Sequence, residues 1–311
     1  MAGNKNATEV LLADAAGIAR AVEILERGGL VAVPTETVYG LAARADSADA
    51  VAKIYEAKGR PSFNPLIVHV RDAEHAVHFT EVSAPAAKLM DQYWPGPLTL
   101  VLPLSEGAGL APAVTAGLPT LAVRSPAHPV MAQLLGAIEF PLAAPSANRS
   151  GLISPTCAAH VLETLDGRID AVIDGGPCEA GLESTIIAVR DHGSLEELRP
   201  GPIRLGIATS TQVEEIEAPG QLASHYAPGK PVRLNAIEAA ADEFMIGFGA
   251  IPGDCTLSAS GNLAEAASRL YDCLHQAAAS DQPRIAIAPV PAEGIGKAIN
   301  DRLIRAATPP D

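Results

Sequence analysis

The sequence predicts an α/β protein built around a mixed sheet, followed by a small second α/β domain. Short apolar runs that end at proline or glycine alternate with amphipathic segments of helical period, which is the pattern of buried strands covered by helices. Several connections are too short for a crossover helix, so purely parallel pairing is not expected. Aromatic residues make up only 4% of the 311 residues, so Ala, Val, Leu and Ile must fill most of the interior.

The first two thirds of the chain contain most of the predicted elements. Asp14 is the expected N-cap of a helix that runs to Arg27, and Gly28-Gly29 ends it. A strand that follows at 30–33 is stopped by Pro34. We expect further helices at 48–57 and 83–93, and further strands at 66–70, 98–102, 120–123, 141–144, 171–173 and 184–189.

The composition of the chain changes at residues 218–231. This stretch holds three prolines and two glycines without periodicity, which is typical of a linker between domains. Beyond it we expect strands at 244–248 and 284–288 and helices at 263–279 and 297–306. The predicted division is therefore 1–217, a linker at 218–231, and a second domain at 232–311. A domain of about 80 residues is close to the lower limit for independent stability, so it is expected to lean on the first.

Net charge and cysteine spacing exclude several classes of protein. The formal charge of −14 argues against a broad nucleic-acid-binding face, so any site for an anion must be a local concentration of Lys and Arg. Cys157, Cys178, Cys255 and Cys273 form no CxxC pair, which argues against a zinc ribbon or disulfide framework and fits free thiols in a reducing cytosol.

No targeting or membrane segment is evident in the sequence. The first residues lack a hydrophobic signal core. The longest uncharged stretch, 107–123, is broken by prolines and glycines and is too short to cross a bilayer. We therefore expect a cytoplasmic protein that does not contact a membrane.

A basic segment lies between the second predicted helix and the strand at 66–70. Lys58 and Arg60 are separated by one residue and can converge on a polyphosphate, with Lys as a compact charge and Arg as a bidentate fork. Charge alone would favour a solvated basic turn. The neighbouring Ser62 and Asn64, and His69 on the following strand, favour a binding site.

A second polar cluster follows the strand at 141–144. Residues 145–151 read Pro-Ser-Ala-Asn-Arg-Ser-Gly, and Ser-Pro-Thr follows at 154–156. Small hydroxyls and amides just past a strand end suit a nucleotide, although the same residues are common in ordinary turns. Arg124 and Arg199 add two cations at the ends of elements, and each alone would be interpreted as a surface arginine.

Three simpler chemistries are not supported. Ser184 lies in no Gly-x-Ser-x-Gly elbow, so a serine nucleophile is rejected. His75 and His78 have no third candidate ligand nearby, which favours an exposed helix face over a metal site. Thr35 and Thr37, judged by residue type, are more often turn hydroxyls than ligands. The chain also lacks a Walker A lysine motif, so any ATP must be held by a different cradle.

Taken together, several segments resemble the YrdC-type threonylcarbamoyl-AMP synthases. The linker, with His-Tyr-Ala-Pro at 225–228, and the additional C-terminal domain are similar to the longer, two-domain members. The resemblance covers residues 11–231 and is looser beyond them, where the domain is shorter than is usual. The segments are Val-Pro-Thr-Glu-Thr-Val-Tyr-Gly-Leu at 33–41, the basic segment at 58–66, Trp-Pro-Gly-Pro-Leu-Thr at 94–99, Arg-Ser-Pro at 124–126, 144–148, and Ser-Thr-Ile at 184–186.

The resemblance implies a twisted mixed sheet of the YrdC type around a positively charged cavity, with a small Rossmann-like C-terminal domain near the cavity mouth. Lys58 and Arg60 would be the catalytic residues, and no side chain is implied as a metal ligand. Tyr226 in the linker would cover the nucleotide as part of a lid. L-threonine would be bound by Thr35, His69, Arg124 and Ser184, and ATP by Lys58, Arg60, Asn64, Thr120, Ala144, Ser146, Asn148, Ser154, Arg199 and Tyr226.

The implied reaction is a nucleotidyl transfer. L-threonine, bicarbonate and ATP with Mg²⁺ would give L-threonylcarbamoyladenylate and pyrophosphate, by positioning and charge stabilisation rather than a covalent nucleophile. The product would pass to a tRNA threonylcarbamoyl transferase that modifies the adenosine at position 37, with weak or absent tRNA contact by this protein. Two alternatives stay open: an RNA-binding, translation-associated module of the same fold, and carbamoyl transfer in hydrogenase maturation.

Overall fold

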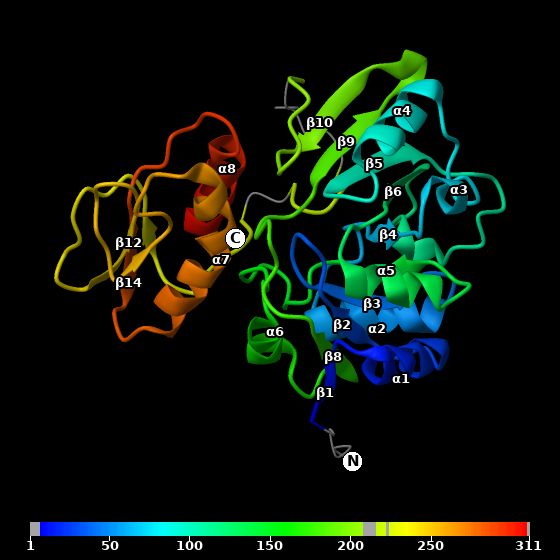
Figure 1. Ribbon diagram of the computed structural model, residues 1–311, viewed down its shortest axis with the longest axis horizontal. Coiled ribbons are helices and arrows are strands. Elements are labelled where there is room, and N and C mark those ends of the chain that lie inside the picture. Colours follow the sequence, from blue (N-terminus) through cyan, green and yellow to red (C-terminus); the bar gives the residue numbers. More distant parts are fainter. Residues whose placement is uncertain (1–6, 208–215, 222–223, 310–311) are drawn as a thin grey trace.

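The chain forms two α/β domains, each around its own sheet (Figure 1). The computed structural model describes residues 7–207, 216–221 and 224–309, so part of the predicted linker, residues 222–223, lies outside the described residues. The strands of the N-terminal domain are β1 (Glu9–Leu12), β2 (Val31–Val33), β3 (Gly40–Arg44), β4 (Ile67–His69), β5 (Leu98–Pro103), β6 (Thr120–Arg124), β7 (Leu142–Ala143), β8 (Ala171–Asp174), β9 (Thr185–Val189) and β10 (Leu195–Arg199).

The sheet of the N-terminal domain is mixed, as predicted. Among the described residues its strand order is β1-β8-β2-β3-β7-β4-β6-β5-β9-β10. The pairs β4–β6 and β5–β9 are parallel, whereas β2–β3, β4–β7 and β5–β6 are antiparallel. The helices of this domain are α1 (Ala15–Glu26), α2 (Ala48–Lys58), α3 (Ala73–Ala76), α4 (Ala84–Tyr93), α5 (Pro129–Gly136) and α6 (Ala158–Leu165), with 3₁₀ turns at Pro112–Val114 and Asp191–Gly193.

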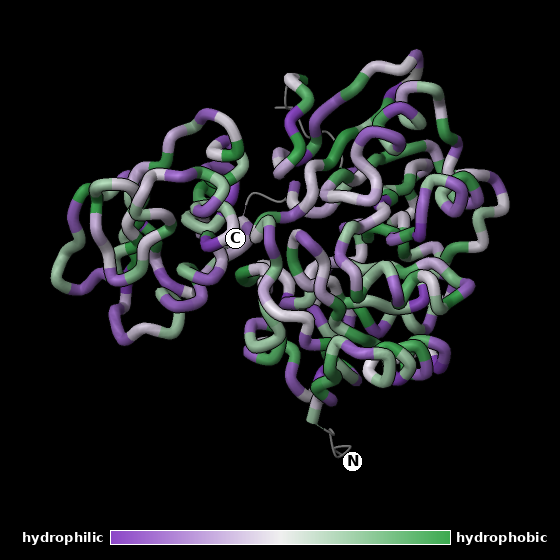
Figure 2. The backbone as a smooth tube through the Cα atoms, viewed as in Figure 1, coloured by the Kyte–Doolittle hydropathy of each residue, from purple (hydrophilic) through white to green (hydrophobic). Residues whose placement is uncertain are grey.

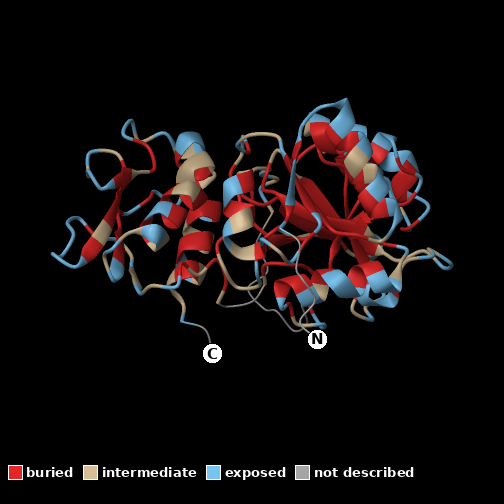
Figure 3. Ribbon diagram, turned by 90° about the horizontal axis from the view of Figure 1, so that it is seen from below, coloured by how far each residue is buried: buried red, intermediate tan, exposed pale blue. Residues whose placement is uncertain are grey.

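Both faces of the large sheet are covered. Along β2, Val31 and Val33 belong to the core cluster that contains the buried residues of α1 and α5, whereas Ala32 between them belongs to the cluster that contains those of α2, α4 and α6. This alternation follows from the two-residue period of a strand. Figure 3 shows the resulting layers: the strands are buried, and the outward turns of the helices are exposed. In Figure 2 hydrophobic and hydrophilic stretches alternate along the chain in both domains.

Helix caps fix the starts of α1 and α2, the helices that precede β2 and the basic segment. The Asp14 carboxylate accepts a hydrogen bond from the Gly17 amide at 2.9 Å and starts α1, as predicted. The Ser47 hydroxyl caps α2 in the same way. Helix α2 ends at Gly59, whose φ of 59° is left-handed and therefore favours glycine. This turn separates the directions of Lys58 and Arg60.

The C-terminal domain has a small parallel sheet, in agreement with the Rossmann-like prediction. Helices α7 (Leu263–Ala279) and α8 (Gly296–Ala307) lie on the side of this sheet that faces the N-terminal domain (Figure 1). The predicted limits of the linker, residues 218–231, remain a prediction. The strands, in sheet order, are β11 (Val232–Arg233), β14 (Arg284–Ile287), β12 (Glu243–Gly247) and β13 (Cys255–Thr256).

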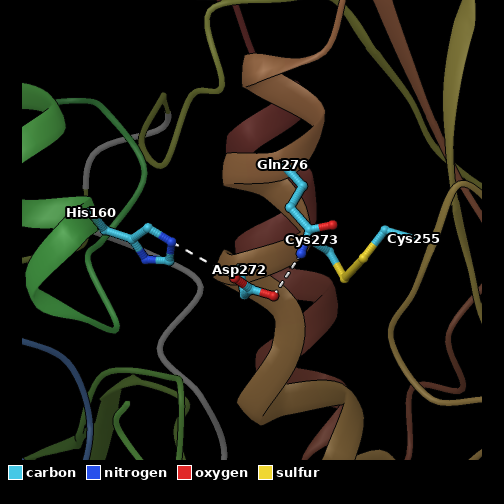
Figure 4. Close-up of a disulfide and its surroundings, with 5 residues drawn as sticks. All are labelled: His160, Cys255, Asp272, Cys273 and Gln276. Atoms are coloured by element: carbon cyan, nitrogen blue, oxygen red, sulfur yellow. Dashed lines mark hydrogen bonds and ion pairs between the residues drawn. A yellow bond between two sulfur atoms is a disulfide. The ribbon is translucent and has the colours of Figure 1, made fainter. Parts of the chain in front are cut away.

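The prediction of four free thiols was wrong for two of them. Cys255 of β13 and Cys273 of α7 form a disulfide, whereas Cys157 and Cys178 are free. The paired residues are 18 positions apart, and only the packing of β13 against α7 brings them together, so no spacing motif marks the pair. Figure 4 shows that the neighbouring Asp272 points the opposite way, toward His160 of α6.

Helices α6 and α7 meet across the domain boundary through two histidines. The rings of His160 and His275 stack with centroids 3.8 Å apart, and the His275 Nδ1 lies 2.7 Å from a carboxylate oxygen of Glu163. Burial, and for His160 the neighbouring His275, lowers the pKa of each ring to about 4. The stack is therefore uncharged at neutral pH.

None of the described helices is long and apolar enough to cross a membrane.

Acid should weaken this contact between the domains. The pKa values of His160 and His275 in the folded protein lie below their usual 6.5, although Glu163 and Asp272 lie nearby. The stabilisation that the neutral rings give is therefore complete above about pH 6.5, and it is lost as the pH falls toward 4. We expect the Tm to fall by several degrees from pH 7 to pH 5.

The double variant His160→Gln/His275→Gln should show a smaller fall in Tm over the same pH range. The control, His78→Gln, changes an exposed histidine and should keep the full fall. Equal pH slopes for the double variant and the unchanged protein would contradict this assignment.

Candidate active site

Strand register brings the predicted threonine-site residues together. In the parallel pair β4–β6, His69 lies directly opposite Arg124, and both strands end there. Strand β9 begins next to the start of β5, so Ser184, just before β9, enters the same region. Thr35 follows β2. These side chains and several predicted nucleotide residues line one pocket: Thr35, Arg60, His69, Arg124, Ala144, Ser146, Ser184, Arg199 and Tyr226.

Arg124 is aimed by two of the sequence motifs. Its Nε donates to the Gly96 carbonyl at 3.1 Å, its Nη1 to Thr37 at 2.9 Å, and its Nη2 to the Glu36 carboxylate at 2.6 Å. Arg124 as a whole is only 3% exposed. The Trp-Pro-Gly-Pro segment and the Thr-Glu-Thr segment therefore act together to hold one cation at the pocket wall.

His69 is neutral beside this cation. Burial, and then the nearby Arg124, lowers the pKa of His69 to about 3. Its Nδ1 is buried and has no hydrogen-bond partner among the described residues. A neutral imidazole with an unused ring nitrogen at a pocket wall is suited to a hydrogen bond with a polar ligand.

Ser184 and Thr35 are held by short hydrogen bonds. The Ser184 Oγ lies 2.7 Å from the Thr99 hydroxyl and accepts from the Arg199 Nη2 at 3.0 Å. The Thr35 Oγ1 accepts from the amides of residues 37 and 38 and donates to the Val38 carbonyl. Thr35 is thus a turn hydroxyl, as its residue type suggests, and it lines the pocket as well.

Arg60 and Arg199 provide the other two cations of the pocket. Arg60 donates through Nε and Nη2 to the main chain and side chain of Asn64 and through Nη2 to the Pro65 carbonyl, and burial lowers its pKa to about 10. Arg199 donates to the carbonyl of Ser184 and to that of Pro219. The acidic protein therefore does concentrate positive charge locally.

Gly201 explains the Leu-Arg-Pro-Gly segment at 198–201. A Cβ at this position would lie 2.5 Å from the Thr185 amide and 2.8 Å from the Glu183 carbonyl. Only glycine permits this close approach of two backbones. The segment can therefore place Arg199 against the chain that carries Ser184.

Five predicted site residues do not line the pocket. The Lys58 ammonium is buried and donates to the carbonyls of Ser146 and Asn148, at 2.6 Å for the first, so it supports the loop behind the pocket. Burial, and then Arg60, lowers the pKa of Lys58 far below its usual value. The other four are Asn64, which binds Arg60; Asn148, which donates to the carbonyls of Arg149 and Leu152; Ser154, which donates to Glu183; and Thr120, at the opposite end of β6 from Arg124.

Sequence reasoning judged Thr37 a turn hydroxyl, although it lines the pocket and binds Arg124, and it gave no role to Glu36, Glu183 and His225. Glu36 binds Arg124, and Glu183 and His225 line the pocket. Each lies next to a predicted residue, and that adjacency was the available signal. Acidic residues in a chain of net charge −14 are more often solvated, so the two glutamates did not stand out. The remaining lining residues are Val38, Gly40, Ile67, Pro145, Pro219 and Gly220.

Four of the described linker residues line the pocket: Pro219, Gly220, His225 and Tyr226. Tyr226 is 1% exposed, and its backbone has a left-handed φ of 63°. Its ring packs edge-on against His225 with centroids 4.0 Å apart. Burial, and then Glu183, raises the pKa of Tyr226 to about 12, so the phenol keeps its proton. The linker therefore forms one wall of the site.

A separate cluster of His160, Glu163 and His275 has three potential metal-ligand atoms within 4.8 Å of one another. The two rings are nearly parallel, with an interplanar angle of 10°. Their in-plane lone pairs therefore do not converge on one point, as ligands of a shared ion should. This geometry favours packing between the domains.

Comparison with known proteins identifies the family. A family model for Sua5, YciO and YrdC, described as "Telomere recombination", matches residues 23–201. A second, described as "Threonylcarbamoyl-AMP synthase, C-terminal domain", matches residues 194–308. The chain is similar to the threonylcarbamoyl-AMP synthase of Bacillus subtilis, with 41% identity over 93% of this chain and 92% of that protein. For that of Pyrococcus abyssi, identity is 39% over 92% and 93%.

A solved structure supports the same assignment. The crystal structure of P. abyssi Sua5 complexed with L-threonine superposes with a TM-score of 0.88, at 35% sequence identity, and covers 96% of this chain and 98% of that one. Because both family models match in succession and the relatives align nearly end to end, this chain is an enzyme that belongs to the two-domain threonylcarbamoyl-AMP synthase family.

Proposed function

We propose that the protein makes L-threonylcarbamoyladenylate from L-threonine, bicarbonate and ATP and releases pyrophosphate. The observation that carries this proposal is a single pocket lined by three arginines, Arg60, Arg124 and Arg199, with neutral His69 directly opposite Arg124 in the strand register. Such a pocket offers one cationic position for an amino acid carboxylate and two for phosphates. The names of the relatives and the threonine complex of the P. abyssi protein support the choice of substrates.

Threonine would occupy the side of the pocket formed by β4, β6 and β9. Arg124 would take the carboxylate, because its planar fork matches a carboxylate and Glu36 and Thr37 already fix its orientation. His69, Ser184 and Thr35 would bind the remaining polar groups of threonine. The amine would then point toward the nucleotide.

ATP would occupy the side that carries Arg60 and Arg199, with Ser146 and the backbone of Ala144 at its base. Lys58, which holds the carbonyls of this loop, would reach the phosphates only by exchanging those carbonyls for phosphate oxygens. Asn64, Asn148 and Ser154 would act from behind the pocket wall, and Thr120 from the start of β6.

The chemistry requires positioning rather than a protein nucleophile. The threonine amine would capture CO₂ derived from bicarbonate, and an oxygen of the resulting carbamate would attack the α-phosphorus of ATP as the bond to pyrophosphate breaks. Arg60 and Arg199 would stabilise the charge that develops on the phosphates. The linker with Tyr226 would exclude water from the mixed anhydride.

ATP would enter as its Mg²⁺ complex. Among the described residues that line the pocket, Glu183 is the one carboxylate, and it is already engaged by Arg302. The residues therefore fit a metal carried by the triphosphate better than one held by side chains. The product would pass to a tRNA threonylcarbamoyl transferase in the cytoplasm, for modification of the adenosine at position 37.

The threonine dependence of pyrophosphate release tests the proposal. Incubation with ATP, bicarbonate and Mg²⁺ should release pyrophosphate only when L-threonine is present. Release that is indifferent to threonine would reject the proposal. Tight tRNA binding with a steep salt dependence and no ATP turnover would instead favour the RNA-binding alternative.

Replacing Arg124 by Lys should impair threonine binding. A lysine keeps the charge but loses the bidentate fork, so we expect the KM for threonine to rise by roughly tenfold or more while the KM for ATP changes little. Steady-state pyrophosphate release measures both constants. Arg71→Lys, at an exposed arginine just past β4, is the matched control. An unchanged threonine KM would remove Arg124 from the carboxylate site.

Replacing Lys58 by Met should impair use of the nucleotide. The change leaves two buried carbonyls without their donor, so we expect kcat/KM for ATP to fall by roughly tenfold or more, with a smaller effect on threonine. The control, Lys53→Met, removes a lysine of the same helix that binds the Gly28 carbonyl far from the pocket. A loss as large in the control would show that only α2 is being disturbed.

A further inference from the structure

The carboxylate of Glu183 is the meeting point of the two domains. It accepts hydrogen bonds from the Ser154 hydroxyl at 2.6 Å, from the Tyr271 hydroxyl at 2.9 Å to each oxygen, and from the Arg302 Nε at 3.0 Å. Ser154 belongs to the N-terminal domain, Tyr271 to α7 and Arg302 to α8. All four side chains are buried, and Arg302 is 0% exposed.

The carboxylate is ionised because of these partners. Burial alone would raise the pKa of Glu183, but Arg302, Arg199 and the Ser154 hydrogen bond outweigh it and lower the pKa to about 2. A buried carboxylate that loses its cation is strongly unfavourable. The state of Glu183 therefore depends on an arginine of the other domain.

Glu183 is also connected to residues predicted for both substrates. It lines the pocket itself and directly precedes Ser184, whose hydroxyl binds Arg199. Its partner Ser154 is a predicted nucleotide residue. The guanidinium carbon of Arg302 also lies 5.6 Å from the ring centroid of Tyr226, the residue of the linker that covers the site.

We propose that Arg302 is a positioning residue for the reaction: through Glu183 it fixes Ser184 and Ser154 and so couples docking of the C-terminal domain to the geometry of the pocket. This inference rests on the proposed function. Arg302 acts through Glu183 and the Tyr226 ring, and Tyr271 assists it by orienting both carboxylate oxygens.

A second ion pair between the domains provides a control that distinguishes positioning of the pocket residues from docking of the domains alone. Lys297 of α8 lies 3.2 Å from Glu197 of β10, and the lysine side chain is 50% exposed. This pair also joins the domains, but Glu197 does not line the pocket. Lys297→Met is therefore a matched control on the same helix.

The test compares the unchanged protein with Arg302→Met, Arg302→Lys, Tyr271→Phe and Lys297→Met. Threonine-dependent pyrophosphate release is measured from pH 5 to pH 8, with separate KM values for threonine and ATP, and Tm is recorded for each. We expect Arg302→Met to lose at least tenfold in kcat/KM and to gain an acid limb, because Glu183 without its cation takes up a proton at higher pH. Arg302→Lys should recover part of the activity, and Lys297→Met should stay within twofold.

Two outcomes overturn the inference. One is an Arg302→Met protein that behaves kinetically like Lys297→Met with an unshifted pH profile. If Arg302→Met does not fold, Tyr271→Phe decides, because it removes only one hydroxyl; an unchanged pH profile and unchanged KM values would reject the coupling. Failure of the unchanged protein to release pyrophosphate with threonine would be a failure of the proposed function and is visible as such.

Discussion

The arrangement of this protein depends on one buried negative charge. The Glu183 carboxylate can remain away from water only while a cation and several donors surround it, and these come from the N-terminal domain, α7 and α8. Apolar residues close around this centre: Val38, Ile153 and Leu182 of the N-terminal domain pack into the core of the C-terminal domain. An interface that encloses a hydrogen-bonded carboxylate among buried apolar side chains is not a loose tether.

Most of the fold could be predicted because its strands are apolar runs with abrupt ends. The runs that became β4, β5, β6 and β9 were placed within one or two residues, and α7 was placed at its observed limits. Strand β3 was missed because Gly-Leu-Ala-Ala-Arg lacks the β-branched residues that mark strands. Helices α5 and α6 were also missed, because each has only eight residues, too few to show a clear helical period of hydrophobic residues.

Nine of the fourteen predicted site residues line one pocket, but the sequence did not predict which side chains would face it. Lys58 and Arg60 are two positions apart and carry the same charge, yet only Arg60 lines the pocket, because the left-handed turn at Gly59 separates them. Whether a side chain faces a ligand or supports the wall depends on such turns and on partners distant in sequence. Glu183 and the disulfide at Cys255 were missed for the same reason: the role of each depends on contact with a residue further along the chain.

The backbone of Tyr226 gives the proposed cover an energetic character of its own. A left-handed φ of 63° at a bulky residue costs of order 1–3 kcal/mol, and here burial of the ring offsets that cost. The closed linker is thus held by its side chain against the preference of its own main chain. Displacing Tyr226 would relieve this strain, so the linker costs less free energy to move than an unstrained segment with the same contacts.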